Sequence, residues 1–164
     1  GSTLFNLLPK DVVDEYLSDL REHVNRSSGG ISHTFTFVGL NATCEELGLQ
    51  YMSQANAKKI KTQWGIEIKV DKSSRNLDFA INKNGKLYFI ECNFYGGGGS
   101  KLKSTATEYV KMNEYWNAQN IIFIWVTDGA GWKSTLKPLR EYFDKADYLL
   151  NLEMLKNGRL QEII

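Results

Sequence analysis

Few of the residues that build metal or redox centres occur in this sequence of 164 residues. It contains two cysteines, Cys44 and Cys92, and two histidines, without CxxC or HxxxH spacing. Two isolated cysteines cannot form a disulfide framework or a structural zinc site. The composition therefore excludes a disulfide-stabilised scaffold and gives no support to zinc or triad chemistry.

Long hydrophobic runs are also absent. The longest, 121–126, is far shorter than the roughly 20 residues that span a bilayer, and no basic stretch followed by apolar residues opens the chain. Proline occurs only 2 times and charged residues make up 24%, so the composition of a disordered chain is absent too. We expect one folded, cytoplasmic domain that does not contact a membrane.

Neither sign of charge dominates, because 20 Lys and Arg stand against 19 Asp and Glu. The resulting net charge of +1 is unlike the strong basic excess that nucleic-acid-binding proteins usually show. A net charge is a sum over the whole chain, however, and separate acidic and basic segments can cancel in it. The balance therefore leaves a nucleic-acid partner open.

Hydrophobic spacing predicts the first half of the secondary structure. We expect a helix over 9–24, a strand or extended segment over 31–40, and a helix from Thr43 to near Gly65. Thr43 and Glu46 have the spacing of a capping box at the start of that helix. Strands are expected at 66–70, 77–82 and 86–94, and the turn residues Asn84 and Gly85 favour a tight hairpin between the last two.

The second half is predicted to alternate helices and strands. After four glycines at 96–99, Ser100 is expected to cap a helix that ends near Trp116. A buried strand at 121–127, a basic helix at 133–143 and a short strand at 148–152 complete the expected order. Because the strands cluster before the first crossover, this order predicts an α/β fold with a central mixed sheet flanked by helices rather than a doubly wound repeat.

The hairpin carries two acidic residues, Asp78 and Glu91. Side chains alternate along a strand, so Glu91 and Asn93 share one face, and the hairpin turn would place Asp78 beside Glu91. Burying unpaired carboxylates is costly, and a bound Mg²⁺ that activates water for attack on a phosphodiester would explain them. The alternative is that both are solvated strand ends, or that they pair with Lys69 or Lys86.

Asp78 followed by Glu91, Cys92 and Asn93 resembles the PD-(D/E)XK nuclease pattern. The longer runs Asn76 to Phe79 and Ile90 to Leu102, together with 125–131 and 151–154, look like the DpnII and MboI family of type II restriction endonucleases. This resemblance covers about residues 40–155. It implies a PD-(D/E)XK restriction-endonuclease-like core, with 1–40 as an N-terminal helical or extended segment and 41–164 as the catalytic domain.

The resemblance also implies a function. It is Mg²⁺-dependent hydrolysis of double-stranded DNA at GATC, in a restriction system whose adenine methyltransferase protects the host. Because both strands of a palindrome are cut, a homodimer is expected. The short length and the Gly1–Ser2 start without Met indicate a catalytic domain cut from a longer protein. Two alternatives remain: a DNA-repair or other PD-(D/E)XK nuclease, and an inactive DNA-binding module.

Within this resemblance, Asp78 and Glu91 would bind the metal. Asn93 stands where the general pattern has Lys, so it would hold the water but could not offset charge. Lys101, or otherwise Lys103, could supply the missing positive charge, although Lys101 could equally contact only a phosphate. Glu46, or next Glu45, resembles the helix acid that assists the metal site, with helix capping as the alternative.

The glycine loop and nearby basic residues are the expected DNA contacts. Residues without Cβ let the backbone approach another surface, here a phosphate near the helix start, and a plain flexible loop is the alternative. Basic segments near the acidic site would contact further phosphates, although each taken alone is more often a solvated helix face. The predicted DNA-binding residues are Gly97, Gly98, Gly99, Ser100, Lys101, Lys103 and Lys133.

Overall fold

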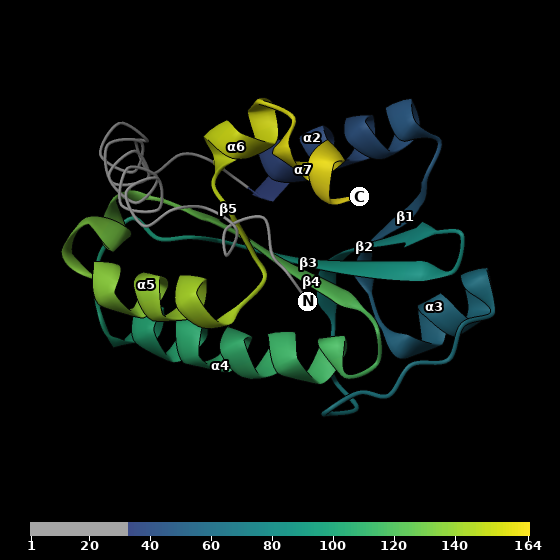
Figure 1. Cartoon of the computed structure of the whole chain (residues 1–164), viewed down its shortest axis with the longest axis horizontal. Helices are drawn as coiled ribbons and strands as arrows, with labels where there is room; N and C mark the ends of the chain where they lie inside the picture. Colours follow the sequence, from purple (N-terminus) through teal and green to yellow (C-terminus); the bar gives the residue numbers. More distant parts are fainter. Residues whose placement is uncertain (1–32) are drawn as a thin grey trace.

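The computed structural model describes residues 33–164, which form one mixed five-stranded sheet with helices on both faces (Figure 1). The predicted α/β class with a flanked mixed sheet is confirmed. The elements in chain order are α2 (His33–Leu47), β1 (Gln50–Ala55), α3 (Ala57–Trp64), β2 (Leu77–Lys83), β3 (Lys86–Phe94), α4 (Ser100–Asn117), β4 (Ile122–Asp128), the 3₁₀ helix η1 (Ala130–Ser134), α5 (Leu136–Lys145), β5 (Tyr148–Leu150), α6 (Leu152–Lys156) and α7 (Arg159–Ile163).

The strands lie in the order β1-β2-β3-β4-β5. β2 pairs antiparallel with both β1 and β3, whereas β3, β4 and β5 run parallel to one another. α4 connects β3 to β4, and α5 connects β4 to β5. Both connections step the same way across the sheet, and right-handed crossovers of this kind place both helices on the same face. Figure 1 shows α4 and α5 together on one side of the sheet and α2, α6 and α7 on the other.

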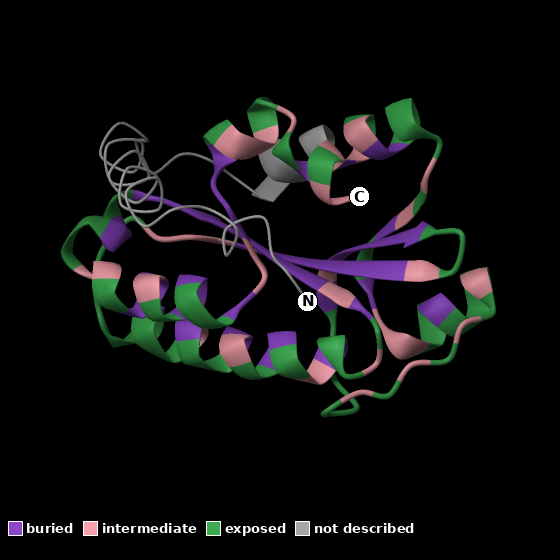
Figure 2. Cartoon of the chain, in the orientation of Figure 1, coloured by how far each residue is buried: buried purple, intermediate pink, exposed green. Residues whose placement is uncertain are grey.

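The core follows the three central strands, which are coloured as buried over most of their length in Figure 2. Phe79 on β2, Phe89 on β3 and Phe123 on β4 are completely inaccessible to solvent. A sheet covered on both faces needs continuous apolar strands rather than alternating ones, as the sequences of β3 and β4 show. Polar side chains within these strands therefore stand out.

The predicted hairpin is confirmed. Asn84 and Gly85 both have positive φ, at 52° and 89°, which a two-residue turn between twisted strands requires. The side-chain Oδ1 of Asn82 accepts the backbone N–H of Gly85 at 2.7 Å and closes the turn. The turn sets the register of β2 and β3, in which Phe79 lies opposite Ile90.

Two predictions for residues 31–65 are wrong. Residues from His33 onward form the helix α2 instead of a strand, so Thr43 and Glu46 lie inside it and form no capping box. The single helix expected up to Gly65 is interrupted by β1. Gly48, with φ of 66°, ends α2, and the Asn56 side chain caps α3 by accepting the N–H of Lys59.

Residues 66–70 were expected to form a strand, but they do not. Ile66, Ile68 and Val70 pack partly buried against the core, while the Lys69 backbone exchanges two hydrogen bonds with the Gln119 side chain. That side-chain amide satisfies the backbone groups that a neighbouring strand would otherwise pair.

The helix after the glycines is confirmed, but Ser100 is its first residue rather than its cap, since Gly99 occupies the cap position without a side-chain bond. α5 begins at Leu136, because η1 takes up the residues that were expected to open it. β5 ends at Leu150, since Asn151 caps α6 by accepting the N–H of Met154. The expected strand at 148–152 is therefore shorter, and neither α6 nor α7 was expected.

The helix predicted over 9–24 lies outside the described residues, and α2 runs without a break across residue 40. Within 33–164, no helix is long and apolar enough to cross a membrane.

Candidate active site

The acidic pair lies where β2 begins and β3 approaches its end. The register that pairs Phe79 with Ile90 brings Asp78 opposite Glu91, as the sequence predicted. The Asp78 Oδ2 accepts the backbone N–H of Cys92 at 2.9 Å, and the two carboxyl groups also share a hydrogen bond. Asp78 is half-buried and Glu91 is only 7% exposed. The structure therefore places two carboxyl groups in direct contact.

Burial controls the protonation of this pair. Loss of solvent, the charge of Asp78 and the shared hydrogen bond, in that order of effect, together raise the pKa of Glu91 to about 9. At neutral pH the free site thus keeps a proton on Glu91, which bridges it to Asp78. Two carboxylates that hold a proton in this way are poised to exchange it for a cation.

Arg75 is the cation that acts on this pair. Its positive charge lowers the pKa of Glu91, opposing the stronger effect of burial. The Arg75 side chain is 10% exposed, and its guanidinium is held by Asp71 and, at 3.4 Å, by Glu108 of α4. Arg75 precedes Asp78 by only three residues, but nothing in the local pattern identified it in advance.

Asn93 continues the row of side chains that starts at Glu91. Its Oδ1 accepts the indole N–H of Trp125 at 2.9 Å, and its backbone carbonyl accepts the Thr127 hydroxyl at 2.8 Å. Asn93 also interacts with the hydroxyl of Tyr109 on α4, whose pKa is raised by burial and by the nearby charge of Glu91. Asn93 is therefore fixed by β4 and α4.

The glycine loop contacts the chain itself. Gly131 donates its backbone N–H to the Tyr95 carbonyl at 2.7 Å, and Tyr95 donates to the Asp128 carbonyl at 3.0 Å. A Cβ added to Gly131 would lie 2.4 Å from the Gly97 oxygen, and one added to Gly98 would lie 2.6 Å from the Ser134 hydroxyl. The two loops that follow β3 and β4 thus approach each other closely, and the approach of the glycines to a phosphate stays a prediction.

The remaining predicted DNA-binding residues lie around these loops. Ser100, Lys101 and Lys103 are exposed in the first turn of α4, and Lys133 is exposed in η1. The Lys101 side chain makes no hydrogen bond or ion pair with any described residue. Gly97 and Gly99 are exposed, and a Cβ added to either would meet nothing within 4 Å. These groups are exposed to a ligand, and none of them is among the hydrogen-bond partners of Asp78 or Glu91 in the described residues.

Glu46 lies apart from the carboxylate pair. It is an exposed residue near the end of α2. Among residues 33–164, no three His, Cys, Asp or Glu side chains gather closely enough to hold a metal ion, so Glu46 does not complete such a group. The pair of Asp78 and Glu91 nevertheless fits Mg²⁺, which takes one or two carboxylates and completes its shell with water and phosphate oxygens.

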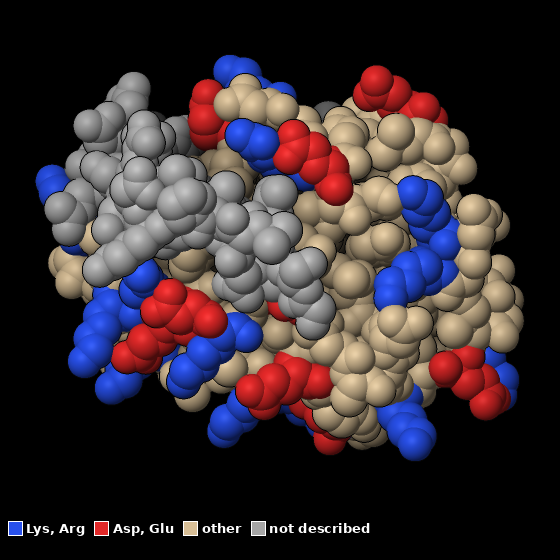
Figure 3. Space-filling model, in the orientation of Figure 1, with Lys and Arg blue, Asp and Glu red and all other residues tan. Residues whose placement is uncertain are grey.

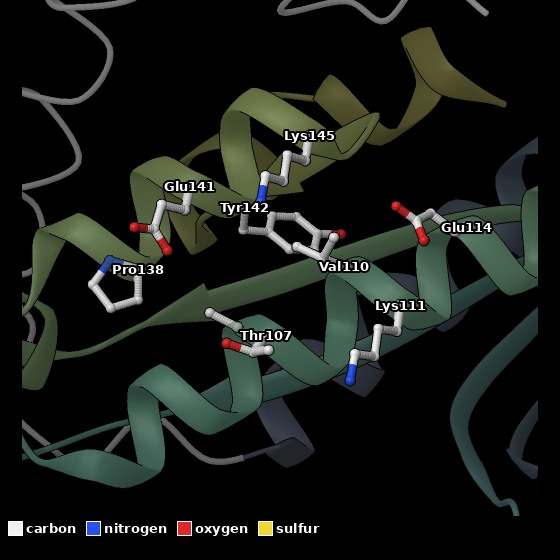
Figure 4. Close-up of a pocket in the computed structure, with 9 residues that line it drawn as sticks. Thr107, Val110, Lys111, Glu114, Pro138, Glu141, Tyr142 and Lys145 are labelled. Carbon is white, nitrogen blue, oxygen red and sulfur yellow. The ribbon is translucent and has the colours of Figure 1, made fainter.

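A groove of about 260 Å³ lies between α4 and α5, away from this pair (Figure 4). Val110 and Pro138 contribute apolar surface, and charged residues of both signs from the two helices line it. Neither Asp78 nor Glu91 is among its lining residues.

The surface of the described residues carries both signs of charge. Figure 3 shows Lys and Arg interspersed with Asp and Glu on this face rather than gathered in one basic patch.

Sequence reasoning missed three residues of this site: Arg75, Tyr109 and Trp125. Arg75 follows a polar stretch, and Tyr109 and Trp125 look like ordinary core positions of an amphipathic helix and a buried strand. A polar group on a core aromatic residue needs a partner, and Asn93 is the polar side chain nearest the end of β3. That need is the one available signal for Trp125, but it does not specify the pairing.

The sequence profile of a family described as DpnII restriction endonuclease matches residues 23–162. The type II restriction enzyme MjaIII of Methanocaldococcus jannaschii is 50% identical over 128 residues, which are 76% of this chain and 44% of MjaIII. The type II restriction enzyme LlaDCHI of Lactococcus lactis subsp. cremoris is 46% identical over 120 residues, 71% of this chain and 40% of that protein.

The type II restriction enzyme DpnII of Streptococcus pneumoniae is 41% identical over 90 residues, or 54% of this chain and 31% of DpnII. The chain thus spans less than half the length of the curated relatives it matches. Among solved structures, the crystal structure of AF1548, a protein of unknown function, has a TM-score of 0.47 at 13% identity, covering 78% of this chain and 67% of that one.

Proposed function

Because the chain belongs to the DpnII restriction endonuclease family, we propose that it is the catalytic core of a Mg²⁺-dependent type II restriction endonuclease. Its substrate is double-stranded DNA with the sequence GATC, as the likeness to DpnII and MboI implies. The observation that carries the proposal is the contact between the Asp78 and Glu91 carboxyl groups at the end of β3.

Asp78 and Glu91 hold the metal in this proposal. A Mg²⁺ ion held there would supply a water of lowered pKa and would offset the charge that develops on the phosphate. Glu91 must first lose the proton it shares with Asp78, so the site binds metal and releases a proton together. Glu46, the assisting acid implied by the resemblance, could act there only after a rearrangement, because it is not grouped with the pair in this structure.

Asn93 and Lys101 act on the water and the phosphate. Asn93 lies on the same strand face as Glu91 and offers hydrogen bonds, but no charge, to the water. Lys101, whose side chain at the start of α4 has no hydrogen-bond or ion-pair partner among residues 33–164, supplies a positive charge to the phosphate. This division of roles compensates for the Lys that the general pattern has at position 93.

The loop before α4 receives the DNA backbone. Gly97 and Gly99 are exposed, and α4 begins directly behind them, so its free backbone N–H groups face an approaching phosphate. Gly98 supports this loop by packing against Ser134, while Lys101, Lys103 and Lys133 provide positive charge around it. The enzyme acts in the cytoplasm as a homodimer, with an adenine methyltransferase protecting the host DNA.

The test is a plasmid digest with Mg²⁺, run on adenine-methylated and unmethylated DNA. We expect discrete fragments that end at GATC, and loss of cleavage in D78A and E91A variants that keep the wild-type circular dichroism spectrum. A smear in place of fragments would favour a DNA-repair or other nuclease of this fold. Cleavage that survives both substitutions would refute the assignment of the site.

A second function, a DNA-binding module without chemistry, is favoured by one observation. The side-chain Oδ1 of Asn93 already accepts the indole N–H of Trp125. This alternative predicts that the chain binds a GATC duplex in a gel-shift assay but cuts it in neither Mg²⁺ nor Mn²⁺.

A further inference from the structure

The Asn93 side chain is held in one orientation by Trp125. The indole Nε1 lies 2.9 Å from the Asn93 Oδ1. An indole N–H can only donate, so the amide oxygen must face the indole and the amide NH₂ must turn away from it. The indole N–H of Trp125 therefore determines that the amide NH₂ of Asn93, and not its oxygen, is left to bond other groups.

Trp125 is itself fixed by its surroundings. It is completely buried, and the rings of Tyr142, Tyr109 and Trp132 pack edge-on against it at centroid distances of 4.7, 5.0 and 5.6 Å. Rotating the indole would disturb all three aromatic contacts at once. The direction of its N–H is consequently set before any ligand arrives.

Asn93 lies on the same side of the sheet as the carboxyl pair. Tyr109 interacts with Asn93 through its hydroxyl, and that hydroxyl also lies within the electrostatic field of Glu91 and Asp78. Glu91 and Asn93 are two residues apart on β3 and so share one face of the strand. With its oxygen tied to Trp125, Asn93 has N–H groups left for this region.

We propose that Trp125 is a positioning residue, which makes Asn93 present N–H donors rather than a carbonyl oxygen to the water or phosphate at the acidic pair. This inference rests on the proposed function and deepens it. A Lys at this position would also donate hydrogen bonds without accepting any. An Asn93 whose oxygen is bonded to Trp125 therefore reproduces the hydrogen-bond donation of a Lys, but not its charge. The positive charge must come from elsewhere.

The hydrogen bond from the Trp125 indole to the Asn93 Oδ1, called the clamp below, can be tested without any cleavage. In N93A, which removes the acceptor, we expect the indole proton resonance of Trp125 to move upfield in an NMR spectrum. N93D keeps an acceptor of the same size and should leave the resonance downfield. Trp116 is a matched reference, because its buried indole N–H has no partner in the described structure. A Trp125 resonance that is unchanged in N93A would overturn the clamp.

Kinetics test the consequence for the reaction. W125F keeps an aromatic ring but loses the N–H, and we expect kcat for cleavage to fall by about 10- to 100-fold with KM unchanged. W116F is the control, since it loses no hydrogen bond. N93D, which keeps the acceptor but has no amide N–H, should lose as much as W125F, and adding W125F to N93K should cost nothing further.

The outcomes separate this inference from the function on which it rests. Suppose that the wild type cleaves DNA. If W125F and W116F then cleave at equal rates, or if N93D is fully active, the positioning role is overturned and the nuclease assignment stays intact. If the wild type cuts no DNA, the proposed function fails and the indole resonance alone decides the clamp. If W125F does not fold, N93D decides the donor role, because it leaves Trp125 in place.

Discussion

The carboxyl groups of Asp78 on β2 and Glu91 on β3 share a hydrogen bond, and Glu91 is almost completely buried. Two carboxyl groups in direct contact, one of them buried, resist carrying two negative charges at once. In this structure Glu91 keeps a proton, because its pKa is raised to about 9. Protonation, metal binding and stability are therefore linked at this one contact.

Metal binding should depend on pH. A cation at Asp78 and Glu91 has to displace the shared proton, so we expect about one proton released per ion and an affinity that rises up to roughly tenfold per pH unit below pH 9. Mn²⁺ titration calorimetry in buffers of different ionisation enthalpy measures both quantities. E91Q should abolish the proton release, and an affinity independent of pH in the wild type would contradict this account.

Without metal, the protein should lose stability as the pH rises. Between pH 4.5, the ordinary pKa of Glu, and about 9, the folded Glu91 binds a proton that the unfolded chain does not. The free energy of unfolding therefore falls with rising pH, by at most about 1.4 kcal/mol per unit from this group. Urea unfolding in EDTA should show a flatter profile for E91Q, which should be the more stable protein at pH 8.

Removing Arg75 should strengthen metal binding. Its positive charge lowers the pKa of Glu91 because it disfavours a proton there, and it disfavours a divalent cation at the same place more strongly. We expect R75Q to bind Mn²⁺ roughly three- to tenfold more tightly at pH 9, with a smaller gain at pH 7.5, where the raised pKa of Glu91 makes the proton harder to displace. R159Q is the control, because Arg159 forms an exposed ion pair with Glu162 far along the chain. Equal affinities for both variants would exclude the effect.

The contact between the two glycine loops should be sensitive to a single methyl group. A Cβ at position 131 would lie 2.4 Å from the Gly97 oxygen, and G131A should destabilise the fold by about 1–3 kcal/mol in urea unfolding. G96A is a control in the facing loop after β3, since its Cβ would meet nothing within 4 Å. Similar unfolding midpoints for the two variants would show that the loops separate easily.

Lys101 should contribute to rate and not to folding. K101A removes an exposed side chain that has no partner in the described part of the chain, so we expect unchanged stability and unchanged Mn²⁺ affinity with a cleavage rate about tenfold lower. K111A, on the same helix α4 but in the groove facing α5, should cut at the wild-type rate. N93K should also retain cleavage. Normal cleavage by K101A would remove Lys101 from the proposed mechanism.

The sequence was most informative where structure is local. Asn84 and Gly85 predicted the hairpin, and counting outward from that turn placed Asp78 opposite Glu91. It was least informative around β1, whose sequence QYMSQA carries no strong strand pattern and whose pairing with β2 joins residues more than 20 positions apart. Gly48 and Asn56 mark the ends of the flanking helices, and these signals were outweighed by a continuous apolar stripe.

The sequence by itself thus determined the strand pair, its turn and the adjacency of two acids, because the geometry of a two-residue turn sets the register of its strands. Only the tertiary structure decided how those acids behave. Burial under α4 and the neighbouring strands raises the pKa of Glu91, the parallel pairing of β3 with β4 brings Trp125 to Asn93, and the approach of two loops explains Gly131. Each depends on segments far apart in the chain, whose contact no local pattern encodes.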